Sequence, residues 1–490
     1  MKHLISDKHL KSKRRFEKIL SEDIPKKLVK VIYQCGINLS EGSKLLENNQ
    51  FIDIIKSIKH IPSNSTLRRT VHQLLEEEQN RINELLKNSV FSLIIDETTD
   101  SNSRSWVGII ISNCEFSLCV DLVHANSCTA SNLQKYIIET LLKYNIEFEQ
   151  IQALITDGAP TCMCLGRNIN KLGIKHVVCG AHTLHLISQI IIQNFDKVNI
   201  LCAKINKFFY SGNQSKRKQR WLQANSRMIN KPSLTRWGTW LQTCLDIYNN
   251  KVNLIKFLDH EENTKLKEKI LLLLDNLEVS EQLKIIKYLG GLLIPLIKLI
   301  QNKIITNQLI DSFNNFSNFF FDEKVETQMK IIQTQFNFYS FNTKKKLKEI
   351  FNCIKNKYLN RWDIVKEIIK INYWMSPFYL KRNIFDPQII HTELLNLDIL
   401  PVEFLFNWKE LQKFIFNNNF TIDDNPIKFW TSNKKKFPKI SEHILKKLSI
   451  KPTSCEVERL FSFLTHIDSP RRNQLNDISL KTEVILKYNQ

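Results

Sequence analysis

The chain has 490 residues, 43% of them apolar, which excludes a disordered protein and predicts two to four domains with sizeable cores. The net charge of +21 and the pI near 9.4 favour a polyanionic partner such as nucleic acid, although a lysine-rich solvated surface gives the same charge. The longest apolar block, residues 288–297, is too short to span a bilayer, so no membrane partner is expected.

Residues 1–88 form the first predicted region, which is helical and polar. The basic cluster at 11–15 is a nuclear-import signal, a DNA-contacting arm or an ordinary solvated helix start. Residues 74–86 carry apolar side chains at helical spacing, so we expect them to pack on the next domain. Eleven scattered cysteines predict a reducing compartment rather than a disulfide framework.

The apolar period changes at residue 89. The resulting order β-β-β-α-β-α-β-α predicts an antiparallel meander followed by parallel crossovers. In such a mixed sheet the ends of the first and fourth strands lie close together. Strands are expected at 91–96, 105–112, 115–124, 151–156 and 176–179, and helices at 131–144, near 163–172 and from 181.

Two of these strands end at an aspartate. Asp96 ends the first strand, and Asp157 follows the fourth. Two strand-end carboxylates side by side in a sheet can hold a divalent cation against a phosphate, which indicates chemistry on nucleic acid. Alternatively, both residues cap surface turns. Asp100 remains an alternative to Asp96, whereas Glu97 points off the strand face that carries Asp96.

Cysteine and histidine residues gather between positions 162 and 185. They admit a zinc site as an alternative, although the spacing of Cys162 and Cys164 is unusual for zinc. The other members are His176, Cys179, His182 and His185.

Only helical periodicity is found from about 205 to 430. A basic run within it, Lys216, Arg217 and Lys218, is read with the net charge as part of an electrostatic DNA track. A solvated helix face is the alternative for this run. A helix is expected at 440–448, and an amphipathic helix is expected to run to Tyr488.

These residues, in this order, resemble the hAT superfamily of DNA transposases. The resemblance extends from about residue 89 to 488 and is weakest in the middle. Its motifs are Asp96, Asp157, the Cys-x-x-His pair Cys179 and His182, the pair Arg236 and Trp237, Glu458 within the motif Glu-Arg-x-Phe-Ser, and Arg471 and Arg472 before the last helix.

The resemblance implies an α/β plus all-α protein, in which an RNase H-like mixed sheet is interrupted by a large all-helical insertion. Residues 5–14, with His9, look like the tail of a BED-type zinc finger that is degenerate or truncated. The implied domains are an N-terminal helical region at 1–88 with this remnant, the first part of the core at 89–204, the insertion at 205–430, and the core completion with the dimerisation region at 431–490.

The resemblance also assigns roles to residues. Asp96, Asp157 and Glu458 would bind Mg²⁺ or Mn²⁺, with Glu456 as the alternative to Glu458. Trp237 would stack on an unstacked base beside Arg236, or else is a core anchor. Cys179 and His182 would form a structural motif. Further DNA contacts are implied at Lys216, Arg217, Lys218, Arg471 and Arg472, and apolar dimerisation candidates are Phe429, Trp430, Leu460 and Phe461.

The implied function is metal-dependent cleavage and strand transfer of DNA at transposon ends. The partners would be DNA and further copies of the chain, in a homodimer or a higher homo-oligomer, and the location would be the nucleus. The alternative is a catalytically inactive or domesticated derivative that binds DNA and dimerises for regulation.

Overall fold

The computed structural model describes residues 64–211, 215–225, 227–232, 238–302, 305–336, 341–383, 405–421, 424–468 and 477–489. The chain divides into two compact units. The sheet unit lies within residues 1–154, 159–175 and 456–490, and the helical unit lies within 155–158 and 176–455. Apolar side chains are buried in both units.

The strands form one mixed five-stranded sheet with the order β3-β2-β1-β4-β5. β1 pairs antiparallel with β2, and β2 pairs antiparallel with β3, which confirms the predicted meander. β1 and β4 are neighbours, as expected for the first and fourth strands. The RNase H-like identity of this fold stays a prediction. The strands are β1 (Phe91–Thr99), β2 (Ser105–Ser112), β3 (Ser117–Ala125), β4 (Ile151–Thr156) and β5 (Lys175–Val178).

The predicted order of strands and helices is confirmed. A short turn of 3-10 helix, η1 (Phe148–Gln150), precedes β4. Each of the last three strands is followed by a helix, namely α5 (Ala130–Lys143), α6 (Pro160–Asn170) and α7 (Gly180–Asn194). α6 begins three residues before the predicted start, because the fixed φ and missing N–H of Pro160 suit a first helical turn.

β3 begins two residues later than predicted because residues 113–116 form a turn. The side-chain oxygen of Asn113 accepts hydrogen bonds from the backbone N–H groups of Glu115 at 2.8 Å and Phe116 at 2.9 Å. An asparagine that bonds to the following backbone in this way favours a turn over an extended strand.

One face of the sheet is covered by α4 (Asn64–Leu86), α5 and α6. Successive side chains of a strand point to opposite faces, so alternate residues of β1 and β2 belong to this core. Ile82 and Leu86 of α4 join it, which confirms that residues 74–86 pack on the sheet. Its strand members include Phe91, Leu93, Ile95, Val107, Ile109, Ile111, Leu118 and Val120.

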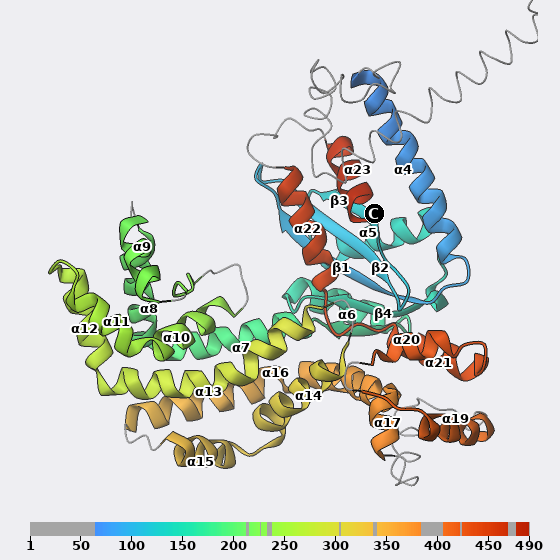
Figure 1. Cartoon of the computed structure of the whole chain (residues 1–490). Coiled ribbons are helices and arrows are strands. Elements are labelled where there is room, and N and C mark those ends of the chain that lie inside the picture. Colours follow the sequence, from blue (N-terminus) through green and yellow to red (C-terminus); the bar gives the residue numbers. More distant parts are fainter. Residues whose placement is uncertain are drawn as a thin grey trace, which may run out of the picture. The chain divides into compact units, whose positions relative to one another are not determined.

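The other face of β2 carries α22 (Cys455–Ile467), seen over the strands in Figure 1. A Cβ atom on Gly108 of β2 would lie 2.8 Å from side-chain carbons of Val457 and Leu460. The absence of a side chain at Gly108 therefore lets the helix approach the sheet closely.

The last helix, α23 (Asp477–Tyr488), closes the β3 edge of the sheet. The side-chain oxygen of Asn489 accepts from the backbone N–H of Cys119 at 2.8 Å, and its amide donates to the carbonyl of Cys119 at 3.0 Å. These two bonds satisfy backbone groups that an edge strand otherwise leaves unpaired.

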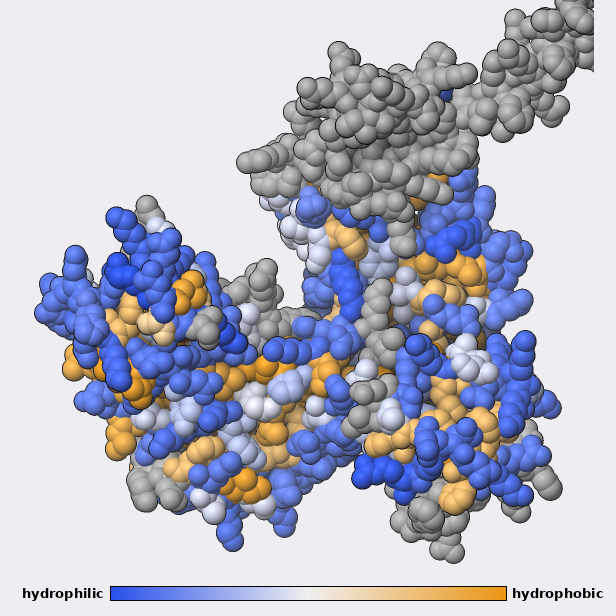
Figure 2. All heavy atoms as spheres, in the orientation of Figure 1, coloured by the Kyte–Doolittle hydropathy of each residue, from blue (hydrophilic) through white to orange (hydrophobic). Residues whose placement is uncertain are grey.

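The described part of residues 205–430 forms helices and no strand, as the periodicity predicts. Much of the face shown in Figure 2 is hydrophilic. The helices of the helical unit after α7 are α8 (Asp196–Tyr210), α9 (Ser215–Ala224), α10 (Thr239–Asn249), α11 (Lys251–Asp259), α12 (Lys265–Asp275), α13 (Leu277–Ile300), α14 (Asn307–Ser317), η2 (Asn318–Asp322), α15 (Val325–Phe336), α16 (Phe341–Met375), α17 (Pro377–Asn383), α19 (Leu405–Asn417), α20 (Pro426–Ser432) and α21 (Pro438–Leu448).

Two expectations for the N-terminal region, the basic cluster at 11–15 and the finger remnant at 5–14, lie outside the described residues. Among the helices that are described, none is long and apolar enough to cross a membrane.

Candidate functional site

The prediction that the first strand ends at Asp96 is wrong, because β1 continues to Thr99. Asp96 lies within this strand, and its side chain is half-buried. Its carboxylate accepts a hydrogen bond from the backbone N–H of Glu97 at 2.8 Å. Asp96 pairs in register with Gly108 of β2, and directly opposed residues of an antiparallel pair share one face of the sheet. Asp96 therefore belongs to the face on which α22 packs.

Glu458 lies in the first turn of α22 and is exposed. Its neighbours Val457 and Leu460 are fully buried and contact the sheet at Gly108. The helix thus brings the segment with Glu458 to the strand pair with Asp96, although more than 300 residues separate them in sequence.

Glu456, the alternative to Glu458, is engaged in packing α22 against α23. It is 5% exposed, accepts a hydrogen bond from the hydroxyl of Tyr488 at 3.1 Å and pairs with Arg459 at 2.6 Å. This burial and pairing raise the pKa of the Tyr488 hydroxyl. Both partners belong to the sheet unit, so the Glu456 carboxylate has a structural role there.

Asp100, the alternative to Asp96, is held in a buried ion-pair network. Its carboxylate pairs with Arg104 at 2.6 Å and accepts from the indole N–H of Trp106 at 2.8 Å. Burial opposes ionisation of Asp100, but the hydrogen bonds from Trp106, Arg104 and Asn102 outweigh it and lower its pKa. Arg104 also pairs with Asp468 and Asp477, each at 3.0 Å. The network gives Asp100 a structural role.

Asp157 belongs to the helical unit, where it follows β4. Its backbone carbonyl accepts a hydrogen bond from the hydroxyl of Thr156 at 2.7 Å. The next residue, Gly158, has a carbonyl that accepts from the guanidinium of Arg361 at 3.4 Å. A Cβ atom on Gly158 would collide with that guanidinium.

Arg361 is the residue near Asp157 that sequence reasoning missed. It lies on α16, more than 200 residues further along the chain, and no motif marks it. Its position is fixed by the next residue, Trp362, which is fully buried and stacks on Phe313 and Phe321 at ring distances of 4.8 and 5.4 Å. Only the three-dimensional packing of α16 reveals this basic side chain beside Gly158.

His182 lies on α7 and also belongs to this part of the helical unit. Burial lowers its pKa, the charge of Asp157 raises it, and the charge of Arg361 lowers it further, so the net shift is downward. A neutral imidazole beside Asp157 follows for solutions near neutral pH.

Cys179 caps the start of α7 and is fully buried. Its backbone N–H donates to the carbonyl of Thr156 at 2.8 Å, and its sulfur accepts from the N–H groups of His182 at 3.5 Å and Ser454 at 3.3 Å. Burial raises the pKa of the thiol, but hydrogen bonds from Cys455, Ser454 and His182 reverse this and lower it to about 7. These contacts tie β4, α7 and the residues before α22 together.

Within the described ranges, no group of three or more His, Cys, Asp or Glu side chains could hold a metal ion. His176, a member of the cysteine and histidine group, shares a hydrogen bond at 3.0 Å with the hydroxyl of Thr156. Of the three predicted metal ligands, Asp96 and Glu458 belong to the sheet unit and Asp157 to the helical unit.

The basic run on α9 is partly engaged within the helical unit. Arg217 pairs with Glu261 at 3.0 Å and donates to the carbonyl of Phe208 at 2.8 Å. The ammonium of Lys218 lies 4.7 Å from the centre of the Tyr210 ring, whereas Lys216 is exposed. Their DNA contacts stay a prediction. The remaining predicted DNA contacts, Arg236, Trp237, Arg471 and Arg472, lie outside the described residues.

The four apolar dimerisation candidates are buried within their own units. Phe429 is 9% exposed and Trp430 is fully buried, with its indole N–H donating to the carbonyl of Met375 at 2.8 Å. Leu460 and Phe461 contact β2 at Gly108. These side chains fill cores of a single chain and do not form an exposed surface.

A comparison with protein families gives one match. Residues 404–489 match the hAT family C-terminal dimerisation region. The matched region runs from α19 to α23 and includes Glu458, and the match supports membership of the hAT family. A comparison with curated proteins found no match.

Proposed function

We propose that the protein is a hAT-type DNA transposase that cleaves DNA strands at transposon ends and joins them to target DNA. Asp96, Asp157 and Glu458 are its catalytic carboxylates in this proposal. It acts in the nucleus as a homodimer or a higher homo-oligomer, with dimerisation supported by the family match at 404–489.

One observation carries the proposal. α22 packs on Gly108, the register partner of Asp96, and thereby returns a carboxylate-bearing segment to the sheet after the long helical stretch. The interaction requires a glycine on β2 and apolar residues at helical spacing on α22, and the sequence supplies both.

The ligand atoms of Asp96, Asp157 and Glu458 indicate which metal they could bind. Three carboxylates offer only oxygen ligands, which Mg²⁺ and Mn²⁺ prefer over sulfur or nitrogen. Two carboxylates about 4 Å apart repel by roughly 4 kcal/mol at an effective dielectric near 20, so a cluster of three requires cations or protons. Bound divalent cations would activate an attacking oxygen and stabilise a leaving oxygen. The donor chemistry therefore fits the metal, but the described geometry includes no assembled metal group.

The chain's own side chains have two further roles in this proposal. Arg361 holds the backbone at Gly158 and brings a positive charge to the residue after Asp157. A guanidinium at that position can bind a phosphate oxygen of the DNA. His182, whose pKa is lowered, stays neutral and adds no competing positive charge beside Asp157.

A second candidate is a catalytically silent derivative that binds DNA and dimerises for regulation. It is favoured by the extent of the family match, which covers the dimerisation region at 404–489. Both candidates would bind DNA through the excess of basic residues in the chain, so binding alone does not separate them.

The separating experiment measures strand cleavage. The full chain is incubated with Mn²⁺ and a plasmid that carries the genomic flanks of its gene. The variants are Asp96→Asn, Asp157→Asn and Glu458→Gln. Loss of a ligand should lower the cleavage rate by roughly 10³-fold or more, while DNA affinity is retained. Matched controls are Asp363→Asn and Glu262→Gln, which change exposed carboxylates of the helical unit and should cleave as wild type.

Two results would overturn the transposase proposal. The first is equal cleavage by the wild type and Asp157→Asn, which removes the carboxylate assignment. The second is DNA binding without any cleavage on either intact or pre-nicked flanks, which identifies the silent derivative.

A further inference from the structure

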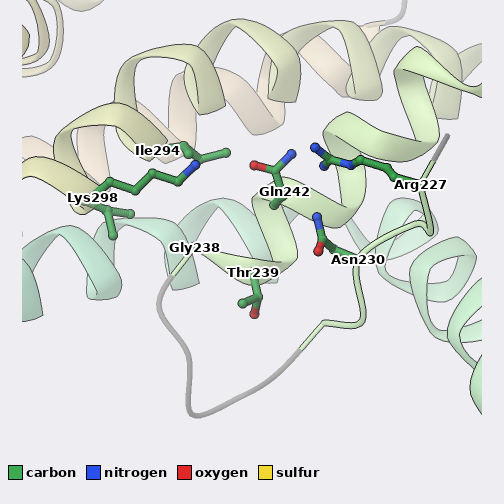
Figure 3. Close-up of a pocket in the computed structure, with 8 residues that line it drawn as sticks. Arg227, Asn230, Gly238, Thr239, Gln242, Ile294 and Lys298 are labelled. Atoms are coloured by element: carbon green, nitrogen blue, oxygen red, sulfur yellow. The ribbon is translucent and has the colours of Figure 1, made fainter.

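A cavity of about 340 Å³, with both polar and apolar walls, lies in the helical unit. Its walls come from α13, from the start of α10 and from residues 227–230 (Figure 3). A second cavity of about 430 Å³ shares Arg227 and Gln242 with it, so the two adjoin. The lining residues of the first are Arg227, Asn230, Gly238, Thr239, Gln242, Ile294, Ile297 and Lys298.

Two cationic side chains enter this cavity from opposite walls. In Figure 3 the ammonium of Lys298 and the guanidinium of Arg227 extend toward each other, with the amide of Gln242 between them. Arg227 pairs with Asp246 at 2.7 Å. No acidic partner is found for Lys298 in the described part of the chain. Two cations and one carboxylate leave one net positive charge, which favours an anion.

The polar wall is held in place before any ligand binds. Asp246 is 4% exposed, and its carboxylate accepts four hydrogen bonds. Arg227 donates at 2.7 Å, Gln242 at 3.1 Å, and Asn230 through its backbone N–H at 2.9 Å and its side chain at 2.7 Å. A buried carboxylate that is satisfied in this way fixes the donors around it, which lowers the entropy cost of binding.

The backbone of residues 227–230 is anchored as well. The indole of Trp221 donates to the carbonyl of Arg227 at 2.9 Å, and the hydroxyl of Tyr210 donates to that of Ile229 at 2.6 Å. The hydroxyl of Thr243 donates to the carbonyl of Asn230 at 2.9 Å. Three helices therefore hold this short segment as a rigid wall of the cavity.

The start of α10 adds to the positive character of the cavity. Gly238 has a φ of +74°, a left-handed conformation that glycine adopts without strain, and no side chain at this position caps the helix. The first N–H groups of a helix and its dipole attract negative charge. This helix start supports the two cations but is not by itself the reason for the site.

We propose that this cavity binds one backbone phosphate of DNA, held between Lys298 and Arg227. The inference rests on the proposed function, because it takes DNA as the ligand. Ile294 and Ile297 form an apolar wall on which the adjacent deoxyribose packs, and the Gln242 amide donates to the phosphate. Asp246 is a positioning residue, since it holds Arg227, Asn230 and Gln242 and does not touch the ligand.

The test measures DNA affinity of the full chain across a series of salt concentrations, with a fluorescent duplex. Each phosphate contact contributes about −0.9 to the slope of log Kobs against log [salt]. We expect Lys298→Gln to make the slope shallower by about 0.9 and Lys298→Arg to retain it. The matched control is Lys287→Gln, which removes the same charge from an exposed position on the same helix outside the cavity.

Three results would overturn the inference, and each differs from the others. Equal slopes for wild type, Lys298→Gln and Lys287→Gln remove the site while DNA binding stands. Salt-independent binding by the wild type removes the proposed function itself. The third result comes from phosphorus NMR of inorganic phosphate added to the protein. If the phosphate signal broadens with the wild type but not with Lys298→Gln, while both bind DNA with the same salt slope, the cavity binds free phosphate and not DNA.

Discussion

At the scale of single residues, charge pairing decides which carboxylates are structural. Asp100 and Asp468 have side chains that are 1% and 0% exposed, and both pair with Arg104, which is 18% exposed. Two buried carboxylates around one guanidinium are tolerable only while that guanidinium is present. The hydroxyl of Ser101 also donates to Asp468 at 3.0 Å, so the network joins the β1–β2 turn to the end of α22.

Arg104→Ala should therefore destabilise the sheet unit strongly. Removing one partner from a buried ion pair leaves uncompensated charge, at a cost of about 3–5 kcal/mol in the free energy of unfolding. Native-state hydrogen exchange of the β1 and β2 amides measures this change. Arg81→Ala is the control, because Arg81 is 45% exposed, and its pair with Glu78 should be worth at most about 1 kcal/mol. Equal effects of the two substitutions would refute the structural role of the network.

The pH dependence gives a second readout of the same substitution. The folded pKa of Asp100 lies below its usual value of 3.8, so the unfolded chain binds the proton more readily. The stabilisation is then complete above pH 3.8 and is lost as the pH falls through the folded pKa. Arg104→Ala removes one of the interactions that lower this pKa, so it should weaken the dependence of stability on pH in that acid range.

At the scale of elements, the close approach of α22 to β2 depends on one missing side chain. The buried residues Val457, Leu460, Phe461 and Leu464 recur at helical spacing and form the face of α22 that meets the sheet. The room for this face exists because position 108 of β2 is a glycine.

Gly108→Ala should therefore displace α22. The added Cβ would approach Val457 and Leu460 to 2.8 Å, well inside normal contact, and overpacking of this kind costs about 1–3 kcal/mol. Hydrogen exchange of the α22 amides should become faster, and strand cleavage should fall with Glu458 out of place. Gly291→Ala on α13 is the control, because nothing lies within 4 Å of its Cβ position. Unchanged α22 exchange in Gly108→Ala would contradict the packing.

The elements themselves were accessible from the sequence because local patterns encode them. Enrichment in Ile, Val and Trp gave β2 with its bounds at Ser105–Ser112, and the aspartate after β4 marked the end of that strand. The start of β3 differs from the prediction, because hydrogen bonds to the side chain of Asn113 form a turn before the strand. Two-residue shifts of this kind depend on side-chain hydrogen bonds that apolar periodicity does not contain.

At the scale of the whole molecule, contacts between residues far apart in the chain could not be predicted from the sequence. Arg104 pairs with both Asp100 and Asp468, and Arg361 lies beside Gly158. Local spacing does not predict these contacts, because they join different elements of the fold. The apolar pattern at Leu460 and Phe461 was visible, but the pattern does not say what covers it. In the structure β2 of the same chain covers both side chains.

The candidate dimerisation region also divides between the two units. Residues 404–455 of the matched region belong to the helical unit, and residues 456–489 belong to the sheet unit. A substitution in this region therefore falls in the core of one unit or of the other. For this reason, loss of dimerisation in such a variant is interpretable only beside a measurement of folding.

The most direct test of the proposed carboxylate site is metal-directed cleavage of the protein itself. Fe²⁺ replaces Mg²⁺, and ascorbate with hydrogen peroxide generates hydroxyl radicals that cut the backbone near the bound metal. If positions 96, 157 and 458 hold the same metal centre, we expect cuts in all three segments of the wild type and their joint loss in Asp157→Asn. Cuts confined to one of these segments, or an unchanged pattern in Asp157→Asn, would contradict a shared metal site.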